Sequence, residues 1–253
     1  MTAATPRFAA KAFVAATLAL ALVACGKSDD GASATAPTGE PIAKIAPPAG
    51  GSWADTFAAT PEGGYRMGNP NAPIKLVEYG ALSCSHCAEF AEKSAAELRD
   101  NFVASGRVSY EVRFFMLNAL DVPATLLATC GAPEATLPLA EQFWGWQKNM
   151  FTSLQSNEAA LNAAGQLPPE QRFAAIAKAG GMDTFFTARG IAADQAKTCL
   201  ADTAKATKMV EATNKAGQEL NITGTPTFFL NGAKLEGNTW EAVKVALEKA
   251  GAR

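Results

Sequence analysis

The sequence predicts an α/β fold in which a β-α-β half and a β-β-α half are separated by a helical insertion of about a hundred residues. Three observations predict it. Short runs of β-branched and aromatic residues, bounded by Gly, Pro and Asn, occur before residue 120 and after residue 220. The alanine-rich stretch between them has apolar residues at helical spacing. A Cys-X-X-Cys sequence stands where the first predicted strand leads into a helix.

Composition limits the functions that the chain can have. Its 253 residues, 48% hydrophobic and 18% charged, suffice for one or two domains with a real core. The formal net charge is −2 and no basic block occurs, so nucleic-acid binding is not expected. His86 is the only histidine, which makes a multi-histidine metal site impossible. Five cysteines are an odd number, so disulfide pairing alone cannot account for all of them.

The first 24 residues are predicted to be a signal peptide. Arg7 and Lys11 precede an apolar run over residues 12–24, which is too short for an ordinary transmembrane helix. The run ends in Leu-Val-Ala-Cys25, which resembles the lipobox of bacterial lipoproteins, where the cysteine is lipidated and the chain is cut before it. Acyl chains on Cys25 would give stable membrane anchoring. The alternative is a plain secretory peptide cut after Ala24, which would leave Cys25 as a free thiol.

Residues 25–60 are expected to be the lipid anchor and a flexible linker. Residues 26–52 are mostly Gly, Ala, Pro, Ser and Thr, with Ile42 and Ile45 as the only large apolar side chains. Such a stretch buries too little surface to offset its ordering entropy. As a flexible chain it would have a reach of about 30 Å. Residues 53–67 are expected to be a short polar lead-in.

The first half of the α/β core is predicted over residues 61–120. Residues 74–79 are β-branched and aromatic and predict a strand, and residues 80–83 form a loop. A helix is expected over residues 88–103 and a second strand over residues 108–117. This order places the Cys-X-X-Cys at the N-terminus of the helix.

Residues 121–220 are predicted to form the helical insertion. Its alanine-rich segments are separated by glycines and prolines, and we find no internal repeat. Residues 139–151, which include Phe143, Trp144 and Trp146, form the most apolar of these segments.

The second half of the core, residues 221–253, is expected to hold a β-hairpin and a final helix. Asn231-Gly232 between two short apolar runs is the strongest short-range hairpin signal. The runs cover residues 227–230 and 233–235. Thr239 is predicted to cap a helix over residues 240–249.

The sequence Cys84-Ser85-His86-Cys87 indicates redox chemistry. Cysteine reacts as a thiolate, and a helix N-terminus favours that negative charge. His86, as a cation or an N–H donor, can stabilise the Cys84 thiolate further. The two sulfurs can close a short disulfide, and stabilising the reduced thiolate makes that disulfide a stronger oxidant. Two alternatives are half of a zinc site, which needs two more ligands, and a purely structural disulfide.

With these motifs the chain resembles the DsbA-like thiol:disulfide oxidoreductases, thioredoxin-fold proteins of the bacterial cell envelope with a helical insertion. The resemblance runs from about residue 67 to residue 251. It rests on residues 67–73 followed by 77–79, on Cys84-Ser-His-Cys87, and on residues 224–228, Gly-Thr-Pro-Thr-Phe. In one position the chain departs from the best-known members, because Ser85 stands where they have proline. The dipeptide between the cysteines tunes the redox potential, so the oxidising strength is left open.

The resemblance implies a role for each residue of the active site. Cys84 would be the exposed sulfur that forms a mixed disulfide with the substrate, and Cys87 the buried resolving sulfur. His86 would tune Cys84. Glu78, six residues before the first cysteine, would lie beneath the second cysteine and relay a proton to or from it. The alternative for Glu78 is a strand-end glutamate that faces water.

The resemblance also implies roles for a proline loop and for two further cysteines. Pro226 would be cis and lie against the sulfurs, leaving the Thr225 backbone to pair with an extended substrate. The alternative is a trans turn proline. Cys130 and Cys199 would form a structural disulfide, as is usual in an oxidising compartment, or remain two buried free thiols. No cofactor and no metal ion are expected.

The predicted function is donation of the Cys84–Cys87 disulfide to reduced or unfolded exported proteins. We expect a monomer in the bacterial periplasm, anchored to a membrane by lipidated Cys25 and recharged by a quinone-linked membrane partner. A reductase or isomerase of the same fold is the second prediction, although known periplasmic isomerases carry an N-terminal dimerisation domain and residues 26–52 are too poor in core residues to form one. An envelope metal-binding protein or a redox-inert binding module is the third.

Overall fold

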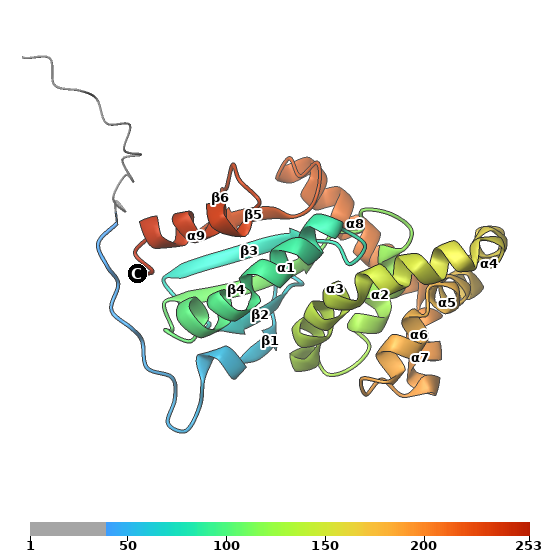
Figure 1. Ribbon diagram of the computed structural model, residues 1–253, viewed down its shortest axis with the longest axis horizontal. Helices are drawn as coiled ribbons and strands as arrows, with labels where there is room; N and C mark the ends of the chain where they lie inside the picture. The colour runs from blue at the N-terminus through green and yellow to red at the C-terminus, as the bar shows by residue number, and fades with distance from the viewer. Residues whose placement is uncertain (1–38) are drawn as a thin grey trace, which may run out of the picture. The chain divides into compact units, whose positions relative to one another are not determined.

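A computed structural model describes residues 39–253 of the chain (Figure 1). The predicted signal peptide, residues 1–24, and the predicted lipidation site Cys25 lie outside the described residues. A six-stranded mixed sheet has the order β1-β2-β4-β3-β5-β6. Its strands are β1 (Phe57–Ala59), β2 (Tyr65–Gly68), β3 (Ile74–Gly80), β4 (Val108–Phe114), β5 (Thr227–Leu230) and β6 (Ala233–Lys234). The central strands β3 and β4 are parallel, and every other pair is antiparallel.

The helices follow the predicted order. A 3₁₀ turn (Trp53–Asp55) precedes the sheet, and α1 (Ser85–Glu97) continues into a π-helical turn (Leu98–Val103) before β4. The described residues between β4 and β5 form α2 (Asp121–Ala128), α3 (Pro133–Ser156), α4 (Glu158–Ala164), α5 (Pro169–Ala179), α6 (Met182–Thr187), α7 (Ala193–Leu200) and α8 (Thr203–Glu219). The last helix is α9 (Trp240–Lys249). The chain therefore has the predicted thioredoxin fold with a helical insertion.

Strand β3 shows why this sheet has one strongly buried face. Successive side chains of a strand point to opposite faces, so Ile74, Leu76 and Glu78 share one face, and all three are fully buried. On that face α1 packs with its Phe90 ring 4.5 Å from the ring of Phe228 on β5. Trp240 at the start of α9 closes the same cluster, since its ring lies 6.1 Å from that of Phe90. Glu78 is thus a carboxyl group on the core side of a central strand.

The hydrophobic core of the sheet continues into the insertion through aromatic side chains. Phe143 of α3 is fully buried and stacks on Phe186 of α6 with ring centroids 5.3 Å apart. Cys130, just after α2, is joined to Cys199 of α7 by a disulfide bond, the pairing that the resemblance implies. The apolar segment predicted over residues 139–151 therefore does form the centre of the insertion.

The expected flexible linker over residues 25–60 is wrong for its second part, residues 39–60. Gly39 donates its backbone N–H to Lys249 and Ile42 donates to Gly251, both at 2.9 Å. The indole N–H of Trp53 donates to the carbonyl of Ile45 at 2.8 Å. Figure 1 shows the start of this segment, in blue, beside the C-terminus. Specific backbone partners hold the segment, and average composition could not reveal them.

Two strands were missed where a polar lead-in was expected, because β1 and β2 are short and contain Ala and Gly rather than a β-branched run. They pair with each other, and β2 pairs with β4, at one edge of the sheet. At the other end of β4 the predicted strand is too long. It stops at Phe114, because Met116 donates its N–H to Thr213 of α8 at 2.9 Å and the chain turns away from the sheet.

Local signals of the second half are confirmed. Asn231 and Gly232 have φ of 50° and 84°, as the predicted hairpin turn requires. The Thr239 hydroxyl accepts a hydrogen bond from the N–H of Ala242 and caps α9. Over residues 39–253, no helix combines the length and the apolar character needed to cross a bilayer.

Candidate active site

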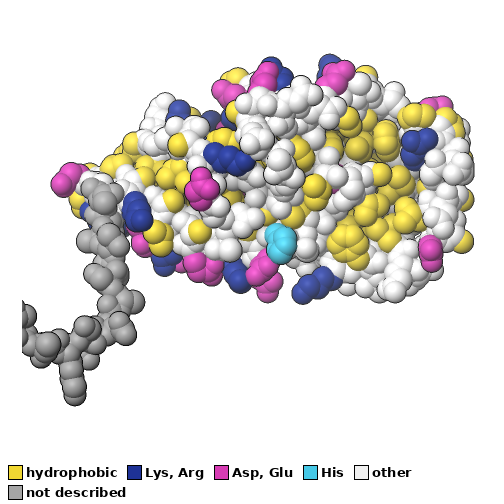
Figure 2. All heavy atoms as spheres, turned by 90° about the horizontal axis from the view of Figure 1, so that it is seen from above, with side chains coloured by type: hydrophobic (Ala, Val, Ile, Leu, Met, Phe, Trp, Pro, Cys, Tyr) yellow, Lys and Arg dark blue, Asp and Glu magenta, His cyan; other side chains and the backbone are white. Residues whose placement is uncertain are grey.

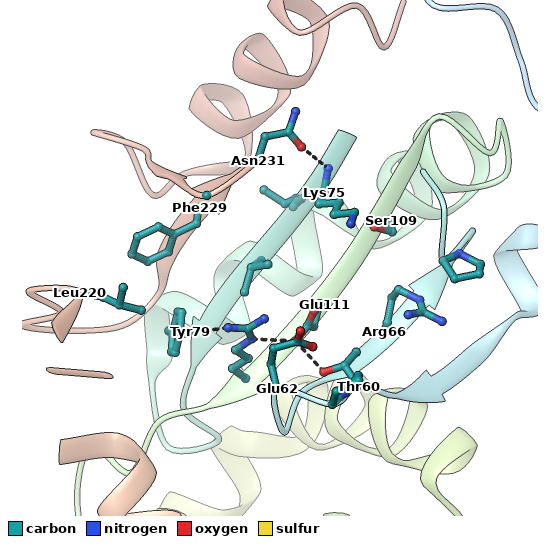
Figure 3. A pocket seen from close by; sticks show the side chains of 16 residues that line it. Thr60, Glu62, Arg66, Lys75, Tyr79, Ser109, Glu111, Leu220, Phe229 and Asn231 are labelled. Carbon is teal, nitrogen blue, oxygen red and sulfur yellow. Dashed lines mark hydrogen bonds and ion pairs between the residues drawn. The ribbon is translucent and has the colours of Figure 1, made fainter. Parts of the chain in front are cut away.

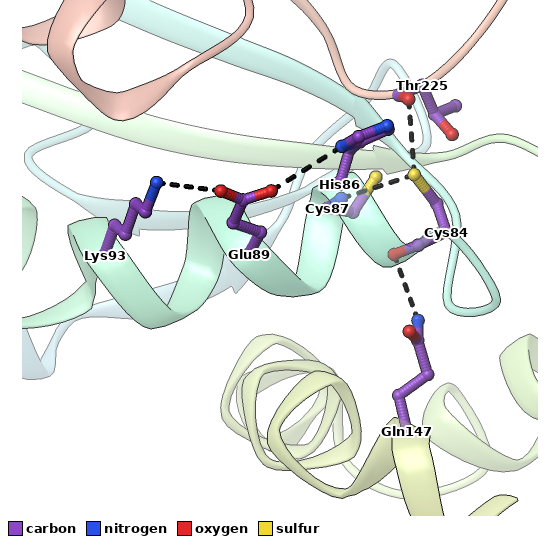
Figure 4. A network of polar contacts seen from close by, with 7 residues as sticks. All are labelled: Cys84, His86, Cys87, Glu89, Lys93, Gln147 and Thr225. Atoms are coloured by element: carbon purple, nitrogen blue, oxygen red, sulfur yellow. Dashed lines mark hydrogen bonds and ion pairs between the residues drawn. The ribbon is translucent and has the colours of Figure 1, made fainter. Parts of the chain in front are cut away.

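The two cysteines lie at the start of α1, where the carboxyl end of β3 faces the loop before β5 (Figure 4). Cys84 is the N-cap residue, 5% exposed, and Cys87 is fully buried. Both are thiols, and the Cys84 sulfur accepts a hydrogen bond from the N–H of Cys87 at 3.3 Å. The Cys84 thiol donates to the carbonyl of Thr225 at 3.2 Å, and the peptide bond from Thr225 to Pro226 is cis. The structure thus brings together the Cys-X-X-Cys and the proline loop, 141 residues apart in sequence.

The environment separates the two thiols in acidity. A hydrogen bond from the Cys87 thiol lowers the pKa of Cys84 to about 6. Hydrogen bonds from the N–H groups of Cys87 and His86 also lower it, whereas burial opposes them. Burial raises the pKa of Cys87 well above its ordinary value. At neutral pH the pair therefore holds a thiolate at Cys84 and a protonated thiol at Cys87, as a nucleophile and a resolving cysteine require.

His86 has a different contact from the one expected. Its ring is 74% exposed, and Nδ1 lies 3.6 Å from a carboxylate oxygen of Glu89, which also binds Lys93 at 2.7 Å. Among the described residues, the ring has no hydrogen bond to Cys84; the backbone N–H of His86 is the group that acts on the sulfur. Tuning of Cys84 by the imidazole itself stays a prediction. Ser85, next to it, is exposed.

Glu78 is fully buried, so the alternative of a strand-end glutamate facing water is wrong. The Tyr110 hydroxyl on β4 donates a hydrogen bond to its Oε2 atom. Within residues 39–253, Oε1 has no hydrogen-bond partner. Burial raises the pKa of Glu78 to about 8, with a smaller contribution from the Cys84 charge. The carboxyl group is therefore mostly protonated at neutral pH and close enough to Cys87 for each to affect the pKa of the other.

Helix α3 holds the loop before Cys84, a contact that the sequence did not predict. Gln147 donates to the carbonyls of Leu82 at 2.7 Å and of Cys84 at 3.0 Å. The indole N–H of Trp144, one turn earlier, donates to Ala81 at 2.9 Å. The available signal was an amide side chain within the most apolar segment of the insertion, because an amide that is buried there needs partners.

Asp121, at the start of α2, holds the same loop from another side. It is fully buried and accepts hydrogen bonds from the N–H of Ser83 at 2.7 Å and from its hydroxyl at 3.1 Å. Asn118 adds a hydrogen bond to the Ser83 hydroxyl at 2.6 Å. The active-site loop is thus held by the insertion and not by the sheet alone.

Apolar side chains are exposed next to the cysteines. Figure 2 shows a stretch of hydrophobic surface to one side of the single histidine. Leu117, 45% exposed, precedes the Asn118 that binds Ser83. Phe151, 41% exposed, lines a groove of about 680 Å³ between α1 and α3 that begins at Ser85. These side chains can contact an apolar partner segment close to the reactive sulfur.

A separate pocket of about 440 Å³ lies on the opposite face of the sheet (Figure 3). There Arg113 binds Glu111 at 2.7 Å and the hydroxyl of Tyr79 at 3.2 Å, while Lys75 and Arg66 also line the wall. Neither active-site cysteine reaches this pocket. Over the described part of the chain, no group of three or more His, Cys, Asp and Glu side chains is placed to hold a metal ion.

Comparison with known proteins agrees with this geometry. The family model for thioredoxin matches residues 60–249. A candidate protein-disulfide oxidoreductase of Rickettsia bellii is 24% identical over 184 residues, which are 73% of this chain and 63% of that protein. The chain thus spans less than two thirds of the length of this relative. Disulfide bond formation protein D of Bacillus subtilis is 22% identical over 72% of this chain and 75% of its own length.

Solved structures have the same architecture. A crystal structure of a protein-disulfide isomerase from Novosphingobium aromaticivorans superimposes with a TM-score of 0.69 at 28% identity, covering 74% of this chain and 96% of that one. Wolbachia pipientis α-DsbA1 superimposes with a TM-score of 0.59 at 19% identity, covering 74% and 89%. Because the thioredoxin model covers most of the chain, including strands β2 to β6 and the proline loop, the chain belongs to the thioredoxin family and has the DsbA-like form of its fold.

Proposed function

We propose that the protein is a thiol:disulfide oxidoreductase that donates the Cys84–Cys87 disulfide to reduced exported proteins. The difference in acidity between the two thiols carries this proposal: the pKa of Cys84 is lowered to about 6 by the Cys87 thiol, and that of Cys87 is raised by burial. A stabilised Cys84 thiolate favours the reduced enzyme. The disulfide form is then a good electron acceptor, because the reduction potential follows the stability of the reduced form.

The reaction has two exchange steps. A substrate thiolate attacks the Cys84 sulfur of the disulfide form, the Cys84–Cys87 bond breaks, and Cys87 leaves with the electron pair and takes up a proton. A second thiolate of the same substrate then attacks the substrate sulfur of the mixed disulfide, and Cys84 leaves as a thiolate. The substrate loses two electrons and gains a disulfide, and the enzyme holds the two electrons as a dithiol. The low pKa of Cys84 makes it the better leaving group in the second step.

The surroundings of Cys84 suit an unfolded chain as the substrate. The carbonyl of Thr225 lies 3.2 Å from the sulfur and can pair with an extended segment that carries the reacting cysteine. Exposed Leu117 precedes the Asn118 that binds Ser83, and exposed Phe151 lies in the groove that begins at Ser85. Both would contact apolar residues that a folded protein buries.

The compartment and the partners are part of the proposal. The disulfide between Cys130 and Cys199 supports an oxidising compartment, which we take to be the bacterial periplasm. Lipidated Cys25 would hold the protein at a membrane, where a quinone-linked partner would reoxidise the Cys84–Cys87 pair. Cys25→Ala is expected to move the protein from the membrane fraction to the soluble fraction. Unchanged fractionation would contradict the lipid anchor and leave the redox proposal standing.

The redox equilibrium with glutathione tests the direction of the reaction. An oxidase is expected to have a potential near about −120 mV, whereas a value near about −270 mV would overturn the assignment in favour of a reductase. Cys84→Ala is expected to abolish oxidation of a reduced protein. The double change Cys130→Ala, Cys199→Ala keeps both reacting sulfurs, leaves no unpaired thiol in the insertion and serves as the control, with oxidation retained.

Isomerisation is the second candidate function. It is favoured by the similarity, at 28% identity, to the solved protein-disulfide isomerase of Novosphingobium aromaticivorans. The reduced protein would then restore activity to an enzyme whose disulfides are scrambled. An oxidase without isomerase activity would restore activity to the reduced enzyme and not to the scrambled one.

A further inference from the structure

A line of polar side chains leads away from the buried sulfur of Cys87. Glu78 is the first of them, and the hydroxyl of Tyr110 donates to its Oε2 atom. Tyr110 lies on β4 and is 3% exposed, so its hydroxyl has no direct access to bulk solvent. The resemblance to the DsbA-like enzymes gives Glu78 a role in moving a proton to or from Cys87 and gives Tyr110 no role.

Tyr110 also borders a small cavity of about 10 Å³. This is room for about one water molecule, and its polar lining groups are Tyr110, Ser94 of α1 and Glu141 of α3. Glu141 is half-buried and also lines the open groove between α1 and α3. The same carboxyl group therefore borders the cavity on one side and solvent on the other.

The other sides of Glu78 are closed. A Cβ atom on Gly80 would lie 2.7 Å from Oε1 of Glu78 and 3.3 Å from the Trp144 ring, so backbone and indole occupy that side. The charged or titratable groups that act on Glu78 are Cys84 just before α1, Cys87 of α1, Tyr110 of β4 and Glu141 of α3. Arg99, in the turn after α1, acts on Glu141. Tyr110 is the one hydrogen-bonding side chain that Glu78 has among the described residues besides the active-site thiols.

We propose that Tyr110 and Glu141, through one water molecule in the cavity between them, conduct protons between Glu78 and the solvent of the α1–α3 groove. The inference rests on the proposed thiol–disulfide exchange and names positioning residues that act through Glu78. Neither touches the substrate.

Each reduction of the Cys84–Cys87 disulfide consumes one proton at Cys87. When Cys87 leaves the disulfide as a thiolate, the Glu78 carboxyl group gives it a proton. Glu78 regains a proton from the Tyr110 hydroxyl, which takes one from the cavity water, which takes one from Glu141. Glu141 is reprotonated from the groove, so one proton moves from solvent to Cys87 in each reduction. In reoxidation each transfer runs in reverse.

Stopped-flow reduction of the disulfide form by dithiothreitol, in H2O and in D2O between pH 5 and pH 9, tests the route. Tyr110→Phe keeps the ring and removes the hydroxyl, and Glu141→Gln keeps the shape and removes the proton carrier. Each is expected to slow reduction roughly 10-fold, which is less than the full rate effect of a positioned general acid or base. Each is also expected to increase the solvent isotope effect. Glu92→Gln, on the same groove but away from the cavity, is the control and is expected to leave both unchanged.

The double variant Tyr110→Phe, Glu141→Gln separates a route from two independent effects on the charge of Glu78. On one route the double variant is no slower than the slower single variant. Multiplied losses, or single variants with the wild-type rate and isotope effect, would overturn the proposal. The redox equilibrium of each variant with glutathione gives its reduction potential, and the measured rates are corrected for any change in that potential. A wild-type protein that does not react with dithiothreitol would instead refute the proposed function.

Discussion

The side-chain amide of Gln147 donates a hydrogen bond to the backbone carbonyl of Cys84 at 3.0 Å, across 63 residues of sequence. A second bond from the same amide nitrogen reaches Leu82 at 2.7 Å. The helical insertion thereby fixes the loop that carries the nucleophilic sulfur. An insertion in the middle of the fold is thus a structural part of the active site.

The first prediction concerns this contact. Gln147→Ala leaves the buried Leu82 carbonyl without its side-chain donor and leaves the Cys84 carbonyl with the N–H of Ala88 alone. It is expected to lower the free energy of unfolding by about 2 kcal/mol. It should also slow attack on the Cys84–Cys87 disulfide, because the loop is no longer held. Urea unfolding and reduction by glutathione measure the two effects. Asn149→Ala, exposed on the same helix, is the control, and equal effects of the two changes would contradict the role of Gln147.

The second prediction concerns the Cys84 thiolate. The Cys87 thiol lowers the pKa of Cys84 to about 6, below the ordinary value of 9.0. The absorbance of the reduced protein at the thiolate wavelength should therefore titrate with a midpoint near pH 6, and Cys84→Ser should abolish that transition. Because the pKa is lowered by folding, its contribution to stability is full above pH 9, decreases as the pH falls from 9 to 6, and is absent below pH 6. A midpoint near 9 would refute the asymmetry of the two thiols.

The third prediction concerns Glu78. Burial raises its pKa to about 8 from an ordinary value of 4.5, so the folded protein binds a proton that the unfolded chain has released. The resulting penalty is absent below pH 4.5, grows up to pH 8 and is then constant. Glu78→Gln should therefore be more stable than the wild type at pH 8 and no more stable at pH 4, while reducing more slowly. Thermal unfolding at both pH values decides the matter, and an equal change at the two would contradict the burial of an ionisable Glu78.

The fourth prediction concerns the disulfide of the insertion. Cys130 and Cys199 are 69 residues apart, and a loop of that length should contribute about 4 kcal/mol in the chain-entropy account. The double change Cys130→Ser, Cys199→Ser is expected to cost about this much in urea unfolding. The same two changes in a fully reducing buffer should cost little, because the wild type has then lost the bond as well. A full loss in both buffers would mean that the serines disturb the packing of α2 against α7.

Features with a local signal were predictable from the sequence. The positive φ of Asn231 and Gly232 follows from the residues that tolerate it, and Thr239 caps α9 because its hydroxyl can reach the backbone. The position of Cys84 before α1 followed from the order of a β-branched run and a helical one. In these cases neighbouring residues decide the structure.

Contacts between distant parts of the chain could not be predicted from the pattern. Tyr110 meets Glu78 across 32 residues because parallel pairing of β3 and β4 sets their register. Alternation along β4 indicates that Tyr110 is buried, but it does not indicate which group accepts the hydrogen bond of its hydroxyl. The prediction of a flexible linker was wrong over residues 39–45 for the same reason, because the hydrogen-bond partners of these residues lie at positions 105, 249 and 251.

The hydrogen bonds of residues 39–45 determine where a force on the N-terminal segment acts on the folded domain. Ile45 is bonded to Ser105 and Ile42 to Arg107, which stands just before the amino end of β4. Cys84 follows the carboxyl end of the parallel strand β3, so a strand of seven residues, about 23 Å, separates the two edges. Under the proposed anchor at Cys25, force from the membrane acts on the edge remote from the sulfurs. The reactive end then remains free to turn toward partners at different distances from the bilayer.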